Sequence, residues 1–101
     1  MSNETKVAKI SDVPPGQCKT VSVNGTDLAL YNVSGTFYAT ANACPHRGGS
    51  LGEGMLEGQL ITCPRHGWQF DVTTGCLANN PQAKVATYPA RVDGDDVLVQ
   101  I

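Results

Sequence analysis

The segment TVSVNGTDLALY, residues 20–31, decides the fold class because it has the pattern of a complete β-hairpin. Residues 20–23 are rich in β-branched side chains and alternate between polar and apolar ones, and residues 28–31 can form the return strand. Between them lies Asn24-Gly25, the dipeptide that suits a two-residue type I′ turn. The segment therefore predicts an antiparallel hairpin.

Further turn signals lie on both sides of this hairpin. Ser34-Gly35 leads into residues 36–40, whose alternation predicts another strand, and Pro14-Pro15-Gly16 is typical of a turn rather than a linker. No window of a dozen residues keeps apolar positions at helical spacing. We therefore expect an all-β fold, an antiparallel β-sandwich or barrel.

The C-terminus repeats the strand–turn–strand pattern. Residues 85–92 are expected to form one strand, residues 93–96 a turn, and residues 97–101 the last strand. Within that last strand Val97, Val99 and Ile101 would share one buried face, because side chains alternate between the faces of a sheet.

Length and composition limit the protein to one folded domain, residues 1–101, without room for a separate catalytic domain. Hydrophobic residues make up 41% and charged residues 16%, which is ordinary globular composition. The net charge is −2 and no run of Lys or Arg is present, so nucleic acid and membrane surfaces are not expected partners. The polar N-terminus and the absence of a long apolar stretch favour a cytoplasmic protein, and we expect a monomer.

Four cysteines and two histidines are the residues that can carry chemistry. Because no export signal is visible, metal ligation or free thiols are favoured over disulfides. The composition changes in the middle of the chain, where five of the eleven glycines lie between Gly48 and Gly58. This segment is expected to be an insertion that forms a site.

Two short boxes in this region each pair a cysteine with a histidine. The first is Cys44-Pro45-His46, and after sixteen residues the second is Cys63-Pro64-Arg65-His66. A tight loop can aim both side chains of a box in one direction, so two loops could hold one inorganic centre. A Cys2His2 zinc site would use the same four donors, although zinc fingers usually group their cysteines together. A disulfide between Cys44 and Cys63 would leave both histidines unexplained.

The two boxes, with glycine after the last histidine, resemble those of the Rieske iron–sulfur family. The similarity to small Rieske ferredoxins extends from about Lys6 to Ile101. Further segments that carry it are Leu30-Tyr31-Asn32-Val33, Tyr38-Ala39-Thr40, Leu51-Gly52-Glu53-Gly54, Leu56-Glu57-Gly58, Phe70-Asp71 and Thr74-Gly75. The resemblance implies a β base with an inserted cluster-binding subdomain of two loops, at about residues 43–70.

The resemblance also implies one [2Fe–2S] cluster, with Cys44 and Cys63 on one iron and His46 and His66 on the other. Two neutral imidazoles in place of two thiolates remove two negative charges from the centre, so an electron is added more easily. Rieske potentials span roughly −150 to +300 mV, against about −400 mV for plant-type ferredoxins.

Differences from the high-potential members of that family predict the low end of this range. Those members carry an extra cysteine in or after each box, where this chain has Gly49 and Arg65, so no disulfide would join the loops. Their second box continues with serine and tyrosine, whose hydroxyls donate to sulfur, whereas this chain has Trp68 and Phe70. Fewer hydrogen bonds to sulfur stabilise the added electron less.

Residues beside the boxes have two interpretations each. Glycines 48, 49, 52 and 54 could be simple turn residues or could allow close approach of the backbone to the cluster. Arg47 and Arg65 could form a docking patch or be ordinary solvated side chains, and Trp68 is favoured as packing under the second loop over surface contact.

The two remaining cysteines have no assigned role. Cys18 is expected to be a small buried hydrophobe, and Cys76 is expected to be exposed in a turn.

The function that the resemblance implies is one-electron transfer by a non-enzymatic carrier. Its partners would be an NAD(P)H-dependent flavin reductase and a terminal oxygenase that hydroxylates aromatic rings. Oxygen activation within this chain is excluded, because a mononuclear iron would need two further histidines. The alternative is a small Rieske subunit or accessory module of a larger enzyme, such as assimilatory nitrite reductase.

Overall fold

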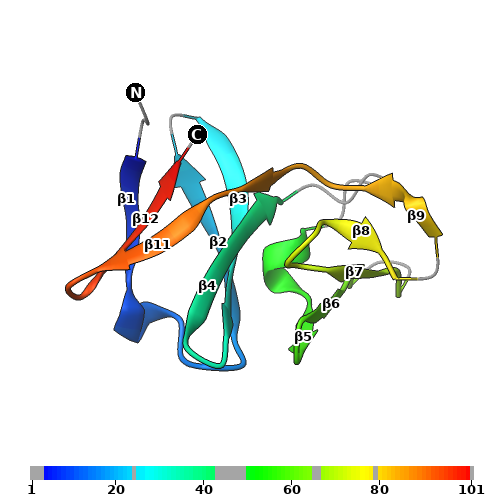
Figure 1. The fold of residues 1–101 in the computed structure, drawn as a ribbon, viewed down its shortest axis with the longest axis horizontal. Helices are drawn as coiled ribbons and strands as arrows, with labels where there is room; N and C mark the ends of the chain where they lie inside the picture. Colours follow the sequence, from blue (N-terminus) through cyan, green and yellow to red (C-terminus); the bar gives the residue numbers. More distant parts are fainter. Residues whose placement is uncertain (1–3, 24, 43–49, 65–66, 79, 101) are drawn as a thin grey trace.

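The computed structural model describes residues 4–23, 25–42, 50–64, 67–78 and 80–100. Within these ranges the chain forms twelve β-strands and two three-residue 3-10 helices, arranged in three antiparallel sheets (Figure 1). The all-β prediction is confirmed. Within the described ranges, no helix is both long and apolar enough to cross a membrane.

Two of the sheets form the base of the molecule, and the third forms a smaller lobe beside it. The first sheet has the order β1 (Glu4–Lys9), β12 (Asp96–Gln100), β11 (Ala90–Asp93). The second has the order β10 (Thr87–Tyr88), β4 (Thr36–Ala41), β3 (Thr26–Val33), β2 (Cys18–Val23). The third has the order β5 (Met55–Glu57), β6 (Leu60–Thr62), β7 (Gln69–Asp71), β8 (Cys76–Leu77), β9 (Asn80–Lys84). The 3-10 helices are η1 (Ile10–Asp12) and η2 (Leu51–Glu53).

The hairpin predicted from residues 20–31 is present as β2 and β3. Val23 pairs with Thr26, which leaves a two-residue turn, and Gly25 has the positive φ of 81° that such a turn requires. The next turn joins β3 to β4 in the same way, with φ values of 52° at Ser34 and 94° at Gly35. Both turns therefore follow from local sequence chemistry.

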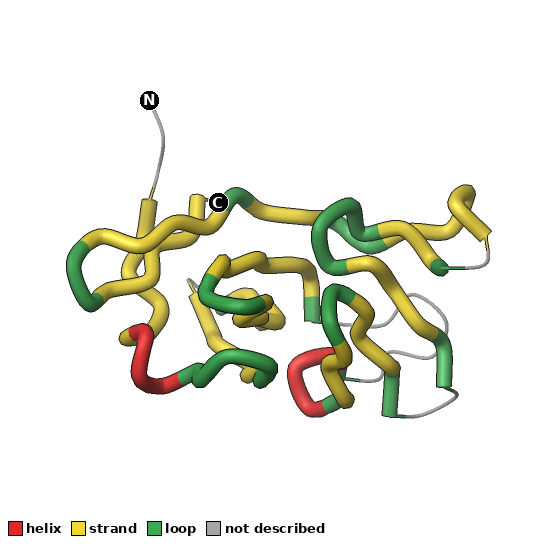
Figure 2. The backbone as a smooth tube through the Cα atoms, turned by 60° about the horizontal axis from the view of Figure 1, so that its bottom comes forward, coloured by secondary structure: helices red, strands yellow, loops and turns green. Residues whose placement is uncertain are grey.

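Strand β3 lies at the centre of the molecule and is buried on both faces. Leu28 and Leu30 point into a core between the two base sheets, where Val97 and Val99 are also fully buried. The alternate residues, Ala29 and Tyr31, point into a second core beneath the third sheet. Because one strand contributes to both cores, the base and the smaller lobe are packed against each other. Figure 2 shows η2 between them.

The five-stranded third sheet was not predicted as a set of strands. Its members are two to five residues long, too short for alternation to be recognised in sequence. Strand β9 contains Pro81 and lies at the edge of the sheet, where a residue without an N–H group interrupts no ladder. The predicted insertion is thus a small sheet that carries the loops.

The prediction of one strand over residues 85–92 was wrong. Thr87 and Tyr88 pair with β4, whereas β11 begins at Ala90 and pairs with β12, so the chain changes sheets at Pro89. Proline has no N–H to donate, and its carbonyl accepts instead from the N–H of Gln100 at 2.9 Å. The predicted C-terminal hairpin is present, with Asp93 paired to Asp96. Ile101 lies outside the described residues.

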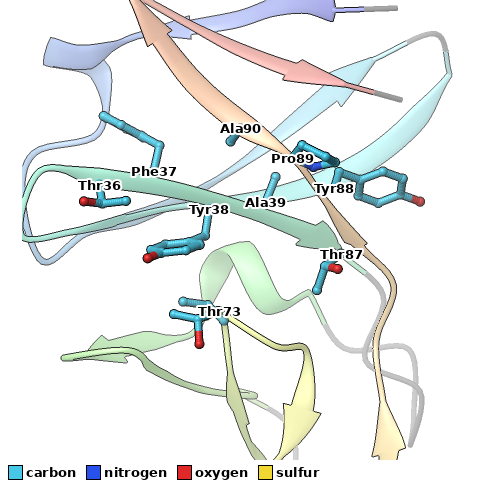
Figure 3. A pocket seen from close by; sticks show the side chains of 10 residues that line it. Thr36, Phe37, Tyr38, Ala39, Thr73, Thr87, Tyr88, Pro89 and Ala90 are labelled. Atoms are coloured by element: carbon cyan, nitrogen blue, oxygen red, sulfur yellow. The ribbon is translucent and has the colours of Figure 1, made fainter. Parts of the chain in front are cut away.

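A cavity lies where the chain changes sheets. Tyr38 of β4 lies on one side of it and Thr73, from the turn after β7, on the other, with Pro89 at its far end (Figure 3). This cavity marks the junction between the base and the third sheet, and Cys63 does not line it.

Candidate metal centre

The second box begins directly after a buried strand. Cys63 follows β6, is 2% exposed and belongs to the core beneath the third sheet. Its N–H donates to the carbonyl of Trp68 at 2.7 Å, and its carbonyl accepts from the N–H of Gly67 at 3.1 Å. These two bonds close the loop between β6 and β7, and Gly67 has a φ of 73° that favours glycine. Cys63 is a free thiol.

The chain that carries the first box is closed at its base by Asn42. The carbonyl of Asn42 accepts from the N–H of Leu51 at 2.8 Å, and its side-chain Oδ1 accepts from the N–H of Gly52 at 2.8 Å. Its Nδ2 donates to Oγ of Ser50 at 2.9 Å. Oγ1 of Thr20, on β2, donates to Oδ1 of Asn42 and contacts Oγ of Ser50, each at 3.2 Å. We call these four residues, Asn42, Thr20, Ser50 and Gly52, the Asn42 clamp.

Two glycines allow the segment after the first box to pack closely against its neighbours. A Cβ at Gly52 would lie 2.6 Å from the backbone N of Thr20 and 2.8 Å from its Cα. A Cβ at Gly54 would collide with the carbonyl oxygen of Thr62, the residue before Cys63. Both glycines are therefore more than simple turn residues, and their close approaches are to β2 and β6, whereas approach of the backbone to the cluster stays a prediction. Gly48 and Gly49 lie outside the described residues.

Strands β5 and β6 form one edge of the lobe, at the entrance of the second box. Met55 pairs with Thr62, so the segment that leaves the first box runs beside the strand that enters the second. A cavity at this edge is lined by Cys63, Pro64, Gly67 and Met55, among others, and the Met55 side chain is 67% exposed. The edge therefore has access to solvent beside a buried thiol.

Three of the four predicted ligands lie outside the described residues. These are Cys44, His46 and His66, and the neighbouring Arg47 and Arg65 lie outside them as well. In the part of the chain that is described, no group of three or more His, Cys, Asp or Glu side chains is placed to hold a metal ion. The structure thus places one predicted ligand, Cys63, and the bases of both loops.

The two cysteines without an assigned role are both half-buried free thiols. Sγ of Cys18 lies 3.5 Å from the carbonyl oxygens of Gly52 and Gly54, and burial raises the pKa of this thiol. Cys18 is therefore a protonated packing residue under η2, close to the prediction. The prediction for Cys76 was wrong, because it lies in β8 rather than exposed in a turn.

The aromatic residues after the second box pack against the core of the lobe. Phe70 is 1% exposed, and Trp68 is half-buried against the same core with its ring centroid 6.4 Å from that of Phe70. The prediction that Trp68 packs against the core is therefore confirmed for the buried part of its side chain. Sequence reasoning did not single out Asn42, Thr20 or Ser50, because their contacts join residues 8 to 30 positions apart.

The family model for the Rieske [2Fe-2S] domain matches residues 3–89, which include both boxes. The chain belongs to the Rieske [2Fe-2S] family. The donor set fits the group that defines this family, since Cys63 is a buried free thiol in a loop closed by backbone hydrogen bonds, and the sequence supplies one further Cys and two His in the boxes. The predictions of a Rieske fold and of one [2Fe-2S] cluster are confirmed.

The relatives of this Rieske protein include electron carriers of dioxygenase systems. It is 39% identical over 100 residues to the ferredoxin component of the naphthalene 1,2-dioxygenase/salicylate 5-hydroxylase systems of a Ralstonia species, covering 98% of this chain and 96% of the relative. Among solved structures, it matches a chain of the complex of reduced oxygenase and oxidised ferredoxin in carbazole 1,9a-dioxygenase with a TM-score of 0.87 and 38% identity, covering 96% and 92% of the two chains.

A putative NADH-dependent nitrite reductase small subunit from Mycobacterium tuberculosis has the same fold, with a TM-score of 0.90, 23% identity and coverage of 100% and 96% of the two chains. At that identity the likeness concerns the fold alone. The chain is a Rieske ferredoxin of the kind found in ring-hydroxylating dioxygenase systems, and as such an electron carrier rather than a catalytic subunit.

Proposed function

We propose that Cys44 and Cys63 bind one iron of the cluster and that His46 and His66 bind the other. The position of Cys63 carries this assignment: it is buried, free and held at the entrance of a closed loop. The closure of the first loop by Asn42 and the pairing of β5 with β6 support it, since they hold the end of the first loop beside the strand that enters the second box. When bound, the cluster accepts and releases one electron at a time.

Replacing His66 with cysteine tests this assignment through charge. A thiolate in place of a neutral imidazole adds one negative charge to the centre, so we expect the midpoint potential to fall by roughly 100 mV or more. The measurement is redox potentiometry of purified protein, with iron and sulfide contents equal to wild type as the control that the cluster has assembled. A His66→Cys protein with full iron content and an unchanged midpoint would contradict the role of His66.

The cluster is further proposed to work at the low-potential end of the Rieske range. Trp68 and Phe70 have no hydroxyl, and they stand where the hydroxyls of high-potential relatives are expected to donate to sulfur. Cys63 is free, and the sequence holds Gly49 and Arg65 where a disulfide between the loops would need cysteines. Neither the hydroxyl donors nor the disulfide expected in the high-potential relatives is therefore available in this chain, and with fewer hydrogen bonds to sulfur the added electron is stabilised less.

The carrier is proposed to take electrons from an NAD(P)H-dependent flavin reductase and pass them to a terminal oxygenase, one that hydroxylates aromatic rings. Two observations support this: the naphthalene-system relative covers nearly the whole chain, and the carbazole-system match is a complex of ferredoxin with oxygenase. The proposed setting is the cytoplasm, where NAD(P)H is available to the reductase. The sharing of β3 between both cores supports a single domain over residues 1–101.

Reconstitution tests the carrier role directly. A flavin reductase, NADH and a ring-hydroxylating oxygenase should form product at a rate that rises with the concentration of this protein. A sample freed of its cluster by chelation is the matched control and should leave the rate at background. If the holoprotein is reduced by the reductase but never re-oxidised by the oxygenase, the proposed direction of electron flow is wrong.

The alternative, a subunit of a larger enzyme, makes a different prediction for the native protein. A carrier forms small transient interfaces, below about 1,200 Å² in total, and elutes alone on size-exclusion chromatography, whereas a subunit co-elutes with its enzyme. The similarity to a nitrite reductase small subunit is at the level of fold and does not favour that alternative.

A further inference from the structure

We propose that Asn42 is a positioning residue for the cluster. By holding both ends of the segment 43–49 against β2, its side chain sets how firmly the cluster is retained and at what potential it is reduced. The inference rests on the proposed ligand set, because Cys44 and His46 lie in that segment.

The first step of the argument is the number of elements that meet at one side chain. Asn42 is 8% exposed, follows β4 directly, and its Oδ1 accepts from the N–H of Gly52, which is in η2. Oγ1 of Thr20 donates to the same oxygen from β2. The side chain of Asn42 therefore connects β4, β2 and η2.

The second step is the length of chain that the clamp closes. The main-chain bond from Leu51 to Asn42 and the side-chain bonds to Ser50 and Gly52 hold the two ends of the segment 43–49 side by side. Without the side chain, one main-chain bond is left to hold that closure. The end at Ser50 would keep its contact with Thr20, whereas the end at Asn42 would lose its side-chain bonds to β2 and η2.

The third step concerns how the first loop is held relative to the second. Gly54 packs against the carbonyl of Thr62, and Met55 pairs with the same residue, so η2 is joined to the strand that precedes Cys63. A separation of η2 from Asn42 would therefore shift the Ser50 end of the segment, together with β6, relative to the end at Asn42. Residues that orient ligands typically change metal affinity about 10- to 100-fold when removed, and they tune potential.

Asn32 offers a matched control within the same hairpin. It is 3% exposed, its Nδ2 donates to the carbonyl of Val13 and its Oδ1 accepts from the N–H of Gly35, both at 2.7 Å. Asn32 is thus a buried, hydrogen-bonded asparagine, as Asn42 is, but its side chain bonds only to backbone groups and it lies in β3, where it pairs with Phe37 near the start of β4. Loss of either side chain destabilises the fold, and only one of them joins the ends of a ligand loop.

The experiment compares Asn42→Ala with Asn32→Ala in the holoprotein. We expect Asn42→Ala to lose iron to a chelator about tenfold faster than wild type, with altered electron paramagnetic resonance g-values after dithionite reduction and a shifted midpoint. Asn32→Ala should lower the melting temperature and leave iron loss, g-values and midpoint as in wild type. Wild-type values of all three for Asn42→Ala, or equal changes in Asn32→Ala, would overturn the proposal.

Two further variants make the result decisive. Thr20→Val removes one hydroxyl from the Asn42 clamp at nearly constant shape, so it should change iron loss, g-values and midpoint in the same direction as Asn42→Ala. If Asn42→Ala does not fold, wild-type values of these three readouts in Thr20→Val overturn the proposal. Cys44→Ala separates this inference from the ligand assignment. If Cys44→Ala retains its cluster, the ligand assignment is wrong, and the inference fails with it. If Cys44→Ala loses its cluster but Asn42→Ala keeps wild-type iron loss, g-values and midpoint, only the role of the Asn42 clamp is refuted.

Discussion

Cys63→Ala should be isolated without iron, without visible absorption and without a paramagnetic signal after dithionite. Alanine has no donor atom, so the iron would lack one of its two thiolate ligands. The loop should still form, because the bonds of residue 63 to Trp68 and Gly67 are made by the main chain.

Cys76→Ala is the matched control for this loss. Cys76 is also a thiol in the third sheet, but it lies in β8, which pairs with β7 and β9 rather than entering the second box. We expect its iron and sulfide contents to equal those of wild type, with circular dichroism showing the same β content for both variants. Full iron content in Cys63→Ala would remove the basis of the ligand assignment.

Gly52→Ala should lower the free energy of unfolding by about 3 kcal/mol, because the added methyl group would lie against the main chain of Thr20 rather than against the flexible end of a side chain. In a domain of this size that corresponds to a fall in melting temperature of roughly 10 to 20 °C. The cluster should also be lost faster, since the N–H of Gly52 is one of the donors to Asn42.

Gly58→Ala controls for the general effect of replacing glycine in this lobe. Gly58 lies in the turn between β5 and β6 with a φ of 59°, and nothing lies within 4 Å of a Cβ built there. Gly58→Ala should lower the free energy of unfolding by about 1 kcal/mol, through backbone strain alone. The measurement is thermal unfolding of both holoproteins at one scan rate. An equal fall in melting temperature for the two variants would mean that Gly52 does not make the close approach described.

Much of the base could be predicted because its signals are local. Asn24-Gly25 and Ser34-Gly35 occur where two-residue turns are needed, and the uninterrupted apolar run of residues 28–31 matches a strand buried on both faces. The change of sheets at Pro89 had a local signal as well, the proline itself, which argues against one continuous strand.

The support of the site could not be predicted in the same way. The strands of the third sheet are too short to show a two-residue period in the sequence. Cys76, for example, lies in β8, which is only two residues long. The bond between Thr20 and Asn42 joins residues 22 positions apart, and neither residue type is unusual where it stands. Such contacts leave no pattern in a sequence window.

The amino-acid sequence alone determined the β class, the donor types and their spacing in two boxes, because turn preference and ligand chemistry are properties of single residues and their neighbours. Only the tertiary structure decided that Cys63 is buried at a loop entrance, that β3 serves two cores, and that Asn42 joins the ends of the first loop to β2. These features depend on packing between distant segments, which is established only when the whole chain has folded.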